Sequence, residues 1–322
     1  MTRFLVTGAA GFIGSHFAEH LLRRGDTVIG VDSFDPMYSR GVKERNLSRA
    51  REEARFSFAE LDVREPGVLE ELLDDRTVLV HLAARAGVRP SLDDPAAYAS
   101  QNVVGTAAVA AAAVRAGVRR VVFASSSSVY GDDTPAPYRE DAPATAPVSP
   151  YGATKRAGEL LLATLAPVGH LTVASLRIFT VYGPRQRPDL AIHAFARKML
   201  AGEAVTMFGD GTARRDYTYV DDMVAGIAAA ADWTAGAPAG IEHFNLAGGR
   251  AVELREMIGA LAGALGVAPR IVGAPPQPGD VRHTEADLAK ARSILGWTPR
   301  TTFDTGIDRF AEWCRGEYAA QR

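Results

Sequence analysis

The sequence predicts an α/β fold in which a doubly wound parallel sheet is followed by a smaller lobe. In the first half of the chain, apolar and β-branched runs typical of buried parallel strands alternate with helical patterns. A glycine-rich turn, GAAGFIG, joins the first of these runs to the first helical stretch. After residue 180 the sequence pattern changes, beginning with the Pro- and Arg-rich loop VYGPRQRPDL. We therefore expect a first domain over residues 1–180 and a second lobe over 181–322, some of whose elements cross back to the first domain.

The expected elements follow in chain order. Strands are predicted at 3–7, 28–32, 56–62, 77–84, 120–127 and 171–179. Helices are predicted between them, near 16–24, 40–54, 65–74, 95–117 and 151–167. The second lobe should hold a short strand at 205–208 and helices near 191–202, 220–232 and 304–318. Because sites in doubly wound sheets form at the carboxyl ends of the strands, polar residues at those ends are the first candidates for function.

Composition excludes several classes of protein. With 322 residues, 47% of them apolar, and a net charge of −2, the chain is typical of a globular protein and nothing favours nucleic acid or an anionic membrane. No apolar run approaches the length of about 20 residues that a membrane helix needs. Cys314 is the single cysteine, and the first strand leaves no room for a signal peptide, so we expect a cytoplasmic protein.

The glycine-rich turn predicts a dinucleotide site. Its glycines suit a tight turn, close approach of the backbone to a pyrophosphate, and close packing of helix on strand, while a helix N-terminus favours phosphate. The next strand ends on Asp32, which suits the ribose hydroxyls of adenosine. No Arg follows at once to hold a 2′-phosphate, so we expect NAD rather than NADP. The residues expected at this part of the cofactor are Gly8, Gly11, Phe12, Ile13, Gly14, Asp32 and Ser33.

A Tyr–Lys pair and a run of serines predict the chemistry. Tyr151 and Lys155, in SPYGATKRAGE, stand one helical turn apart and so share a helix face. An ammonium beside a phenol favours the phenolate and should lower the pKa of the tyrosine. Ser126, in FASSSSVYG, ends a predicted strand and can share the same substrate proton. Together these residues predict a general base that removes a proton from an alcohol while its hydride leaves.

These residues form a pattern that resembles the extended short-chain dehydrogenase/reductase family, with its Rossmann-type sheet, and within it the nucleotide-sugar 4-epimerases. The resemblance runs the whole length of the chain. Through AGVR, SSSSVYG and FTVYGPRQRPD the chain is most similar to UDP-glucuronate 4-epimerases. The motifs that carry it are GAAGFIG, LD at 61–62, HLAARAGVR, SSSSVYG, SPYGATK, LRIFTVYGP, GDGTARRDYTYVDD and PGDVRHTEAD.

The resemblance implies a role for each matched residue. Tyr151 would be the base, Lys155 would steady it and the nicotinamide ribose, and Ser126 would share the O4 proton. Arg215 would clamp the UDP diphosphate, which suits the rigid fork of a guanidinium, and Asp280 would contact the uridine portion. The resemblance also implies a homodimer through the helices near 95–117 and 151–167. Further cofactor contacts that it implies are Asp62 and Val63 beside the adenine, Leu82, Ala83 and Ala84 along the diphosphate and ribose, and Asn102 near the catalytic pocket.

The residues after Ser126 bear on the reaction and on the sugar. Dehydratases of this family keep an Asp–Glu pair there, and UDP-glucuronate decarboxylases keep a Glu in the second place, whereas this chain has Ser127 and Ser128. We therefore expect 4-epimerisation by oxidation at C4, rotation of the 4-keto sugar and return of the hydride. Ser127, Ser128 and Thr180 could supply hydroxyls to the C6 carboxylate of a glucuronate, with Arg89 and Arg185 near the carboxylate or the phosphates.

Several alternatives stay open. A UDP-glucose or UDP-GlcNAc 4-epimerase fits many of the same motifs, and a UDP-glucuronate decarboxylase fits fewer. A non-catalytic NAD-sensing regulator with this fold is a rival of another class, against which the trio of Ser126, Tyr151 and Lys155 counts. No metal is expected, since His16 and His20 have the spacing of ligands but no evident third partner. The remaining expectations are that Tyr130 and Tyr182 are packing aromatics and that His81 is a core histidine. Arg187 and Arg282 rank below Arg215 as substrate contacts, with a surface position as the alternative.

Overall fold

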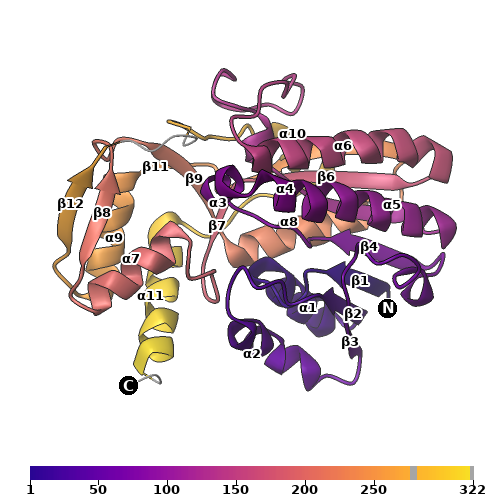
Figure 1. Ribbon diagram of the computed structural model, residues 1–322, viewed down its shortest axis with the longest axis horizontal. Coiled ribbons are helices and arrows are strands. Elements are labelled where there is room, and N and C mark those ends of the chain that lie inside the picture. Colours follow the sequence, from indigo (N-terminus) through magenta and orange to yellow (C-terminus); the bar gives the residue numbers. More distant parts are fainter. Residues whose placement is uncertain (276–280, 320–322) are drawn as a thin grey trace.

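The main sheet has seven parallel strands and confirms the doubly wound α/β prediction (Figure 1). The computed structural model describes residues 1–275 and 281–319. The strand order is β10-β6-β5-β4-β1-β2-β3. The chain adds β2 and β3 on one side of β1 and then β4, β5, β6 and β10 on the other, so the strand order reverses between β1 and β4. The strands are β1 (Arg3–Thr7), β2 (Thr27–Asp32), β3 (Phe56–Glu60), β4 (Thr77–His81), β5 (Arg120–Ser126), β6 (Thr172–Ile178) and β10 (Gly240–Leu246).

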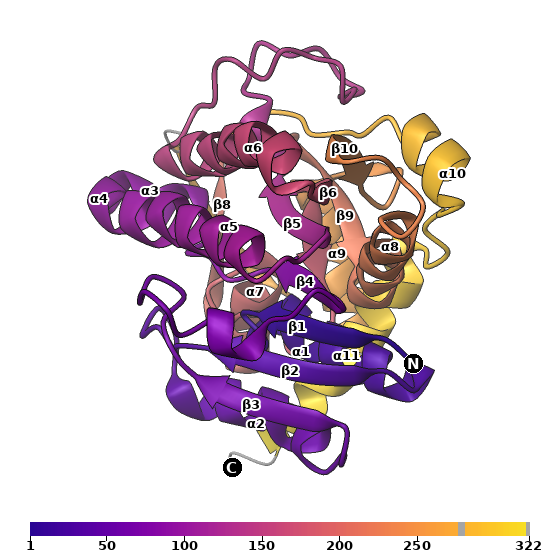
Figure 2. The ribbon, with the colours of Figure 1, turned by 90° about the vertical axis from the view of Figure 1, so that its right-hand side faces the viewer.

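Helices cover both faces of this sheet, as the apolar character of its strands requires. Helices α5 and α6 lie side by side on one face (Figure 2), and α1 packs with α8. Alternate residues of β1 pack in separate hydrophobic cores. Leu5 packs in the cluster that includes Val109 and Leu162, and Phe4 packs in the cluster that includes Phe17 and Ile227. These helices are α1 (Phe12–Arg24), α2 (Arg40–Arg51), α5 (Gly105–Arg115), α6 (Pro150–Gly169) and α8 (Val220–Trp233).

Some boundaries differ from the prediction. The helix predicted at 65–74 is wrong, because only a 3₁₀ turn forms over Glu70–Leu72, after Pro66 and a Gly67 with φ of 84°. The helix predicted near 95–117 consists of α4 (Pro95–Tyr98), a π-helical turn (Ala99–Val104) and α5. Strands β3 and β4 end earlier than predicted, so the residues expected to contact cofactor after them lie in the following loops.

The second lobe contains a three-stranded sheet, β11-β9-β7, and a two-stranded sheet, β12-β8. Strand β10 and helix α8 also come after residue 180, yet β10 pairs with β6 in the main sheet and α8 packs on α1. The described helices include none that is both long and apolar enough to cross a membrane. The other elements of the lobe are β7 (Thr180–Tyr182), α7 (Ala191–Leu200), β8 (Ala204–Phe208), β9 (Arg214–Tyr219), β11 (Ala251–Glu253), α9 (Leu254–Leu265), β12 (Arg270–Ala274), α10 (Ala289–Leu295) and α11 (Phe303–Ala319).

Candidate active site

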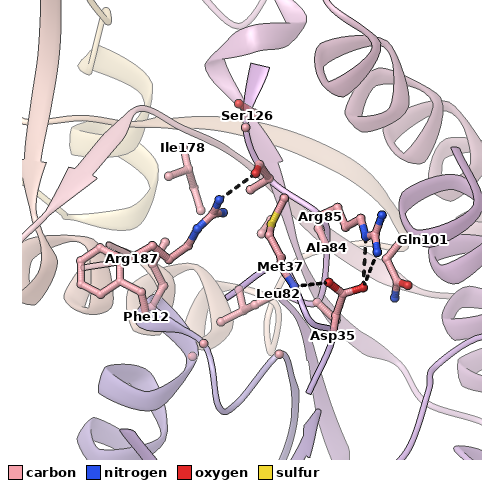
Figure 3. A pocket seen from close by; sticks show the side chains of 18 of the residues that line it. Phe12, Asp35, Met37, Leu82, Ala84, Arg85, Gln101, Ser126, Ile178 and Arg187 are labelled. Carbon is pink, nitrogen blue, oxygen red and sulfur yellow. Dashed lines mark hydrogen bonds and ion pairs between the residues drawn. The ribbon is translucent and has the colours of Figure 1, made fainter. Parts of the chain in front are cut away.

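A cavity of about 360 Å³, here called the front cavity, lies where the strands of the main sheet end (Figure 3). Its walls come from the glycine-rich turn, the ends of β2, β4 and β5, the start of α6 and the segment 178–190. Most of the site residues named from the sequence meet here. They are Gly8, Gly11, Phe12, Ile13, Gly14, Asp32, Ser33, Val63, Leu82, Ala83, Ala84, Ser126, Ser127, Ser128, Tyr151, Lys155 and Thr180.

The glycine-rich turn forms a cradle that side chains would fill. Gly8 has a φ of 74°, and a Cβ there would lie 2.8 Å from the backbone nitrogen of Ala83. A Cβ on Gly14 would lie 2.1 Å from the carbonyl oxygen of Gly8. Helix α1 begins at Phe12, against the cavity, and no side chain caps its N-terminus. Backbone N–H groups and the helix dipole therefore offer an anion site, which fits a dinucleotide pyrophosphate.

Asp32 is held at the end of β2 by backbone donors. The N–H of Phe34 donates to its Oδ1 at 2.8 Å and the N–H of Ala10 donates to its Oδ2 at 3.2 Å. The buried Nζ of Lys43 lies 3.6 Å from Oδ1 and donates to the carbonyl of Asp35 at 2.9 Å. The sequence reading missed Lys43, because α2 brings it to the strand end from a distant position in the chain. A fixed carboxylate at this place fits ribose hydroxyls.

The catalytic candidates lie together, with Ser126 at the end of β5 and Tyr151 and Lys155 on α6. The Nζ of Lys155 donates to the carbonyl of Ala124 at 2.7 Å, and burial lowers the pKa of Lys155 to about 7. Burial also raises the pKa of Tyr151, while the hydroxyl of Ser126 acts in the opposite direction. The expected lowering of the Tyr151 pKa by Lys155 is therefore wrong for these protein groups by themselves, because desolvation of the phenolate dominates.

Helix α6 is fixed against the strand ends by contacts at its start and middle. The N–H of Tyr151 donates to Ser91 Oγ at 3.1 Å, and Ser149 caps the helix by accepting from the N–H of Gly152 at 3.1 Å. One turn beyond Lys155, the buried carboxylate of Glu159 accepts from Ser125 Oγ at 2.7 Å and from Arg177 at 3.0 Å. These bonds join α6 to β5 and β6, so the distance between Tyr151 and Ser126 is set by the core.

Further hydroxyls surround the trio. Ser127 and Ser128 form a 3₁₀ turn directly after β5, and the N–H of Ser128 donates to Ser126 Oγ at 3.2 Å. Thr180 reaches the same cavity from the first position of β7. Neither position that follows Ser126 carries a carboxyl group, so elimination or decarboxylation would find no acid or base there.

Some predicted contacts lie outside the lining of the front cavity. The carboxylate of Asp62 is paired with Arg64, whose NH2 lies 2.5 Å from its Oδ2. Asn102 is buried behind the cavity, where it exchanges hydrogen bonds of 2.8 and 2.9 Å with the backbone of Arg85 and donates to Thr154 at 3.0 Å. Asn102 thus braces one wall of the cavity against α6.

The arginines named for the substrate are dispersed. The guanidinium of Arg89 stacks over Phe208 with 5.0 Å to the ring centroid, which joins the two lobes. Arg215 lies on β9. Burial raises the pKa values of Tyr138 and Tyr217, and the positive charge of Arg215 lowers them in part. Arg185 lies behind the cavity and is paired with Glu19, which corrects its expected place beside the substrate. Asp280 lies outside the described residues.

Arg187 occupies the place expected for Arg185. Its side chain is 11% exposed and lines the front cavity, so the alternative of a surface charge is wrong (Figure 3). NH2 of Arg187 donates to the carbonyl of Ala86 at 3.0 Å and to Asp189 at 2.6 Å. The sequence signal was the repeated Arg in PRQRPD, but the pattern does not reveal which arginine turns inward. Other lining residues that sequence reasoning missed include Asp35, Met37, Tyr38 and Gln101.

The residues expected in the core are there. His81 is buried, with its Nδ1 2.8 Å from Thr7 Oγ1 and its ring stacked on Phe123. Tyr130 and Tyr182 are buried, which confirms them as packing aromatics. In the part of the chain that the structure describes, no group of His, Cys, Asp and Glu is arranged to hold a metal ion.

Known proteins resemble the chain over nearly its whole length. A UDP-glucuronate 4-epimerase of Thermodesulfobacterium geofontis is 36% identical, covering 98% of this chain and 97% of its own. A UDP-glucose 4-epimerase of Mycolicibacterium smegmatis is 40% identical, covering 98% and 99%. The UDP-glucuronic acid 4-epimerase of Bacillus cereus, solved with UDP-glucuronic acid and NAD, superposes with a TM-score of 0.92 at 34% identity, covering 98% and 100%. Since the model of the NAD dependent epimerase/dehydratase family also matches residues 4–247, the chain belongs to that family.

Proposed function

We propose that the protein is an NAD-dependent 4-epimerase that interconverts UDP-glucuronate and UDP-galacturonate. The observation that carries the proposal is the front cavity, where Ser126, Tyr151 and Lys155 meet the hydroxyl-bearing Ser127, Ser128 and Thr180. Two of the relatives described above carry the same activity in their names. The trio supports oxidation at C4, and the lack of carboxyl groups after Ser126 favours return of the hydride over elimination.

The dinucleotide would lie along the glycine cradle. Gly8, Gly11 and Gly14 admit the pyrophosphate, and Asp32 accepts from the ribose hydroxyls. Bound NAD supplies the acceptor for the C4 hydride and its positive charge favours the tyrosinate. The further residues that we propose for the cofactor are Phe12, Ile13, Ser33, Asp62, Val63, Leu82, Ala83, Ala84, Asn102, Tyr151 and Lys155; Asp62 would act through its backbone and Asn102 by bracing the wall.

The catalytic residues move one proton in each direction. Tyr151 takes the proton of the C4 hydroxyl while Ser126 holds the same oxygen, and the hydride leaves C4. Ser126 and Lys155 are buried beside the phenol, and the charge of Lys155 stabilises the phenolate when the ammonium is protonated. After the 4-keto sugar has turned, Tyr151 returns the proton to O4 as the hydride arrives on the opposite face.

The hydroxyl groups protect the carboxylate of the sugar. A 4-keto glucuronate is a β-keto acid, and it loses CO₂ when its carboxylate stands perpendicular to the carbonyl plane. Donors from Ser127, Ser128 and Thr180 would hold the carboxylate away from that orientation. Arg187, whose guanidinium lines the same cavity, would supply a cation for the anionic substrate.

The nucleotide part would extend into the second lobe, residues 181–322. Arg215 on β9 is proposed for the UDP diphosphate, Arg89 for the phosphates from the opposite lobe, and Asp280 for the uridine. For the assembly we propose a homodimer through α5 and α6. Val104, which directly precedes α5, and Leu160, which lies on α6, support it, since these large apolar side chains are 54% and 53% exposed. The single cysteine, which is buried and unpaired, is compatible with a cytoplasmic protein.

A UDP-glucose 4-epimerase is the second candidate, since the relative from Mycolicibacterium smegmatis has that name at 40% identity. One experiment separates the readings. Purified protein is incubated with UDP-glucuronate, UDP-glucose and UDP-GlcNAc, and the products are identified by NMR and mass. A galacto-configured product of unchanged mass from UDP-glucuronate supports the proposal. Turnover of UDP-glucose alone, release of CO₂, or no turnover with bound NAD would replace it with the second epimerase, a decarboxylase or a regulator, respectively.

A further inference from the structure

The loop between β7 and α7, residues 183–190, carries two arginines that face opposite sides. Arg187 lines the front cavity, whereas Arg185 lines a second cavity of about 590 Å³ on the other side of the loop, here called the rear cavity. The rear cavity is lined from α1, α2 and α11 by His16, Glu19, Arg45, Arg49 and Trp313, among others. Arg185 therefore faces the rear cavity and Arg187 faces the active site, from the same loop.

Arg185 is bound to the helix that follows the glycine-rich turn. Its NH1 lies 2.7 Å from Glu19 Oε1 and its NH2 lies 3.1 Å from Glu19 Oε2, which is a bidentate pair on α1. NH1 also donates to the carbonyl of Asn46 on α2 at 3.2 Å. Both partners of the ion pair are largely buried, so the fork geometry fixes the direction of the arginine as well as its charge.

The preceding residue of the loop is held by the same helix. His16 on α1 has its Nε2 2.9 Å from the carbonyl of Pro184 and its Nδ1 3.3 Å from NH2 of Arg185. These contacts require a neutral ring with the proton on Nε2, because Nδ1 must accept from the guanidinium. Burial lowers the pKa of His16 to about 4, in agreement with that tautomer. Consecutive residues of the loop, Pro184 and Arg185, are therefore anchored on α1.

The backbone at Arg185 needs such an anchor. Its φ is 63°, in the left-handed region that residues with a Cβ avoid. Strained backbone of this kind persists where the surroundings impose it. Two residues on, Arg187 reaches the front cavity, so the turn at Arg185 sets the direction in which the rest of the loop leaves.

We propose that Arg185 and Glu19 are positioning residues, whose ion pair holds loop 183–190 on α1 and thereby keeps Arg187 in the front cavity. The inference rests on the proposed function for the substrate that Arg187 meets. Because α1 also begins at the glycine cradle, the pair fixes the substrate side of the site relative to the cofactor side.

A mutant cycle tests whether Arg185 acts through Arg187. We expect Glu19→Gln and Arg185→Ala to lower kcat/KM for UDP-glucuronate about tenfold, chiefly through KM. Arg185→Lys should lie between these variants and the parent, because it keeps the charge but not the fork. Arg185→Ala combined with Arg187→Ala should be no worse than Arg187→Ala alone. Losses that add fully in the double variant would overturn the inference.

The matched control is Arg23→Ala. The guanidinium of Arg23 lies 3.7 Å from Glu19 Oε2 and its side chain is 68% exposed, so removing it alters the charge near Glu19 but leaves the Arg185–Glu19 pair in place. We expect unchanged kinetics for this variant. A loss of kcat/KM equal to that of Glu19→Gln would assign the effect to the electrostatic field around Glu19 and would overturn the positioning role of the loop.

Hydrogen exchange tests the anchor without any substrate. We expect the backbone N–H groups of the loop, which Pro184 and Pro188 lack, to exchange at least about tenfold faster in Glu19→Gln than in the parent or in Arg23→Ala. Unchanged exchange overturns the inference even if the protein turns over UDP-glucuronate. Conversely, faster exchange together with turnover of UDP-glucose alone would keep the anchor and replace the proposed substrate. Glu19→Gln preserves the shape of the side chain, so it answers the question if Arg185→Ala does not fold.

Discussion

The front and rear cavities lie on opposite sides of one loop and differ in how their charged groups are satisfied. The rear cavity is the larger, at about 590 Å³ against about 360 Å³, and it has many arginines. Its charges largely neutralise one another, as in Arg185–Glu19 at 2.7 Å and Arg45–Glu317 at 3.0 Å. In the front cavity Lys155 is buried and Tyr151 is partly buried, and desolvation without a compensating carboxylate shifts the pKa values of both groups. The rear cavity also holds a group with a shifted pKa, His16, but its contacts are with the loop, so a shifted group marks a reactive site only where it faces the cavity beside other catalytic side chains.

The largest effect should follow from removing the front-cavity phenol. We expect Tyr151→Phe to lower kcat at least about 1,000-fold, because a positioned general base contributes on that scale. The variant keeps the ring, whose edge packs against Tyr98 at 6.3 Å between centroids, so folding and retained NAD should be unchanged. Product NMR and the absorbance of bound NAD measure the two quantities. Activity within tenfold of the parent would show that another group takes the proton.

The next effect concerns the fate of the 4-keto sugar. Ser127→Ala should raise the fraction of turnovers that release a decarboxylated 4-keto pentose by about tenfold, since one donor to the carboxylate is lost. Mass spectrometry of the products measures this fraction. Thr180→Ala, at the start of β7, is the parallel variant. Loss of epimerisation in both variants without the pentose product would contradict the hydroxyl cage.

The buried ammonium of Lys155 should lower the stability of the folded protein although catalysis needs it. Burial lowers its pKa from 10.5 unfolded to about 7 folded, so the unfolded chain binds more protons between these values and stability rises with pH across that window. The cost of the buried charge is therefore complete below about pH 7. We expect Lys155→Met to abolish turnover and raise the Tm by about 3 °C at pH 6, with a smaller gain at pH 9. A Tm gain that does not vary with pH would assign the stabilisation to packing.

The smallest effect is expected in the rear cavity. Arg49→Ala removes an exposed cation from its rim, and we expect kcat/KM to stay within about twofold of the parent, as for most exposed substitutions. Steady-state kinetics with UDP-glucuronate measure it. A tenfold loss would mean that the rear cavity contributes to catalysis beyond the Arg185–Glu19 ion pair, and the contrast between the two cavities would fail.

Prediction from sequence succeeded where a residue's role follows from its neighbours along the chain. The strand, glycine turn and helix at the N-terminus are one local unit, and Gly8 and Gly14 lie where a Cβ would collide with backbone. It failed at 65–74, where apolar spacing suggested a helix but Pro66 and Gly67 prevent one. It also missed Lys43, since nothing in the sequence shows that α2 returns this ammonium to Asp32.

The order of residues alone was enough to establish the fold class, the glycine cradle and the types of side chain available for oxidation at C4. These depend on short-range patterns of hydrophobicity, turn and spacing. The folded chain was needed to distinguish Arg185 from Arg187, which have the same chemistry and stand in the same loop. The distinction depends on a left-handed backbone angle and on a carboxylate from another helix. The upward shift of the Tyr151 pKa likewise depends on desolvation, which arises when distant elements pack around the phenol.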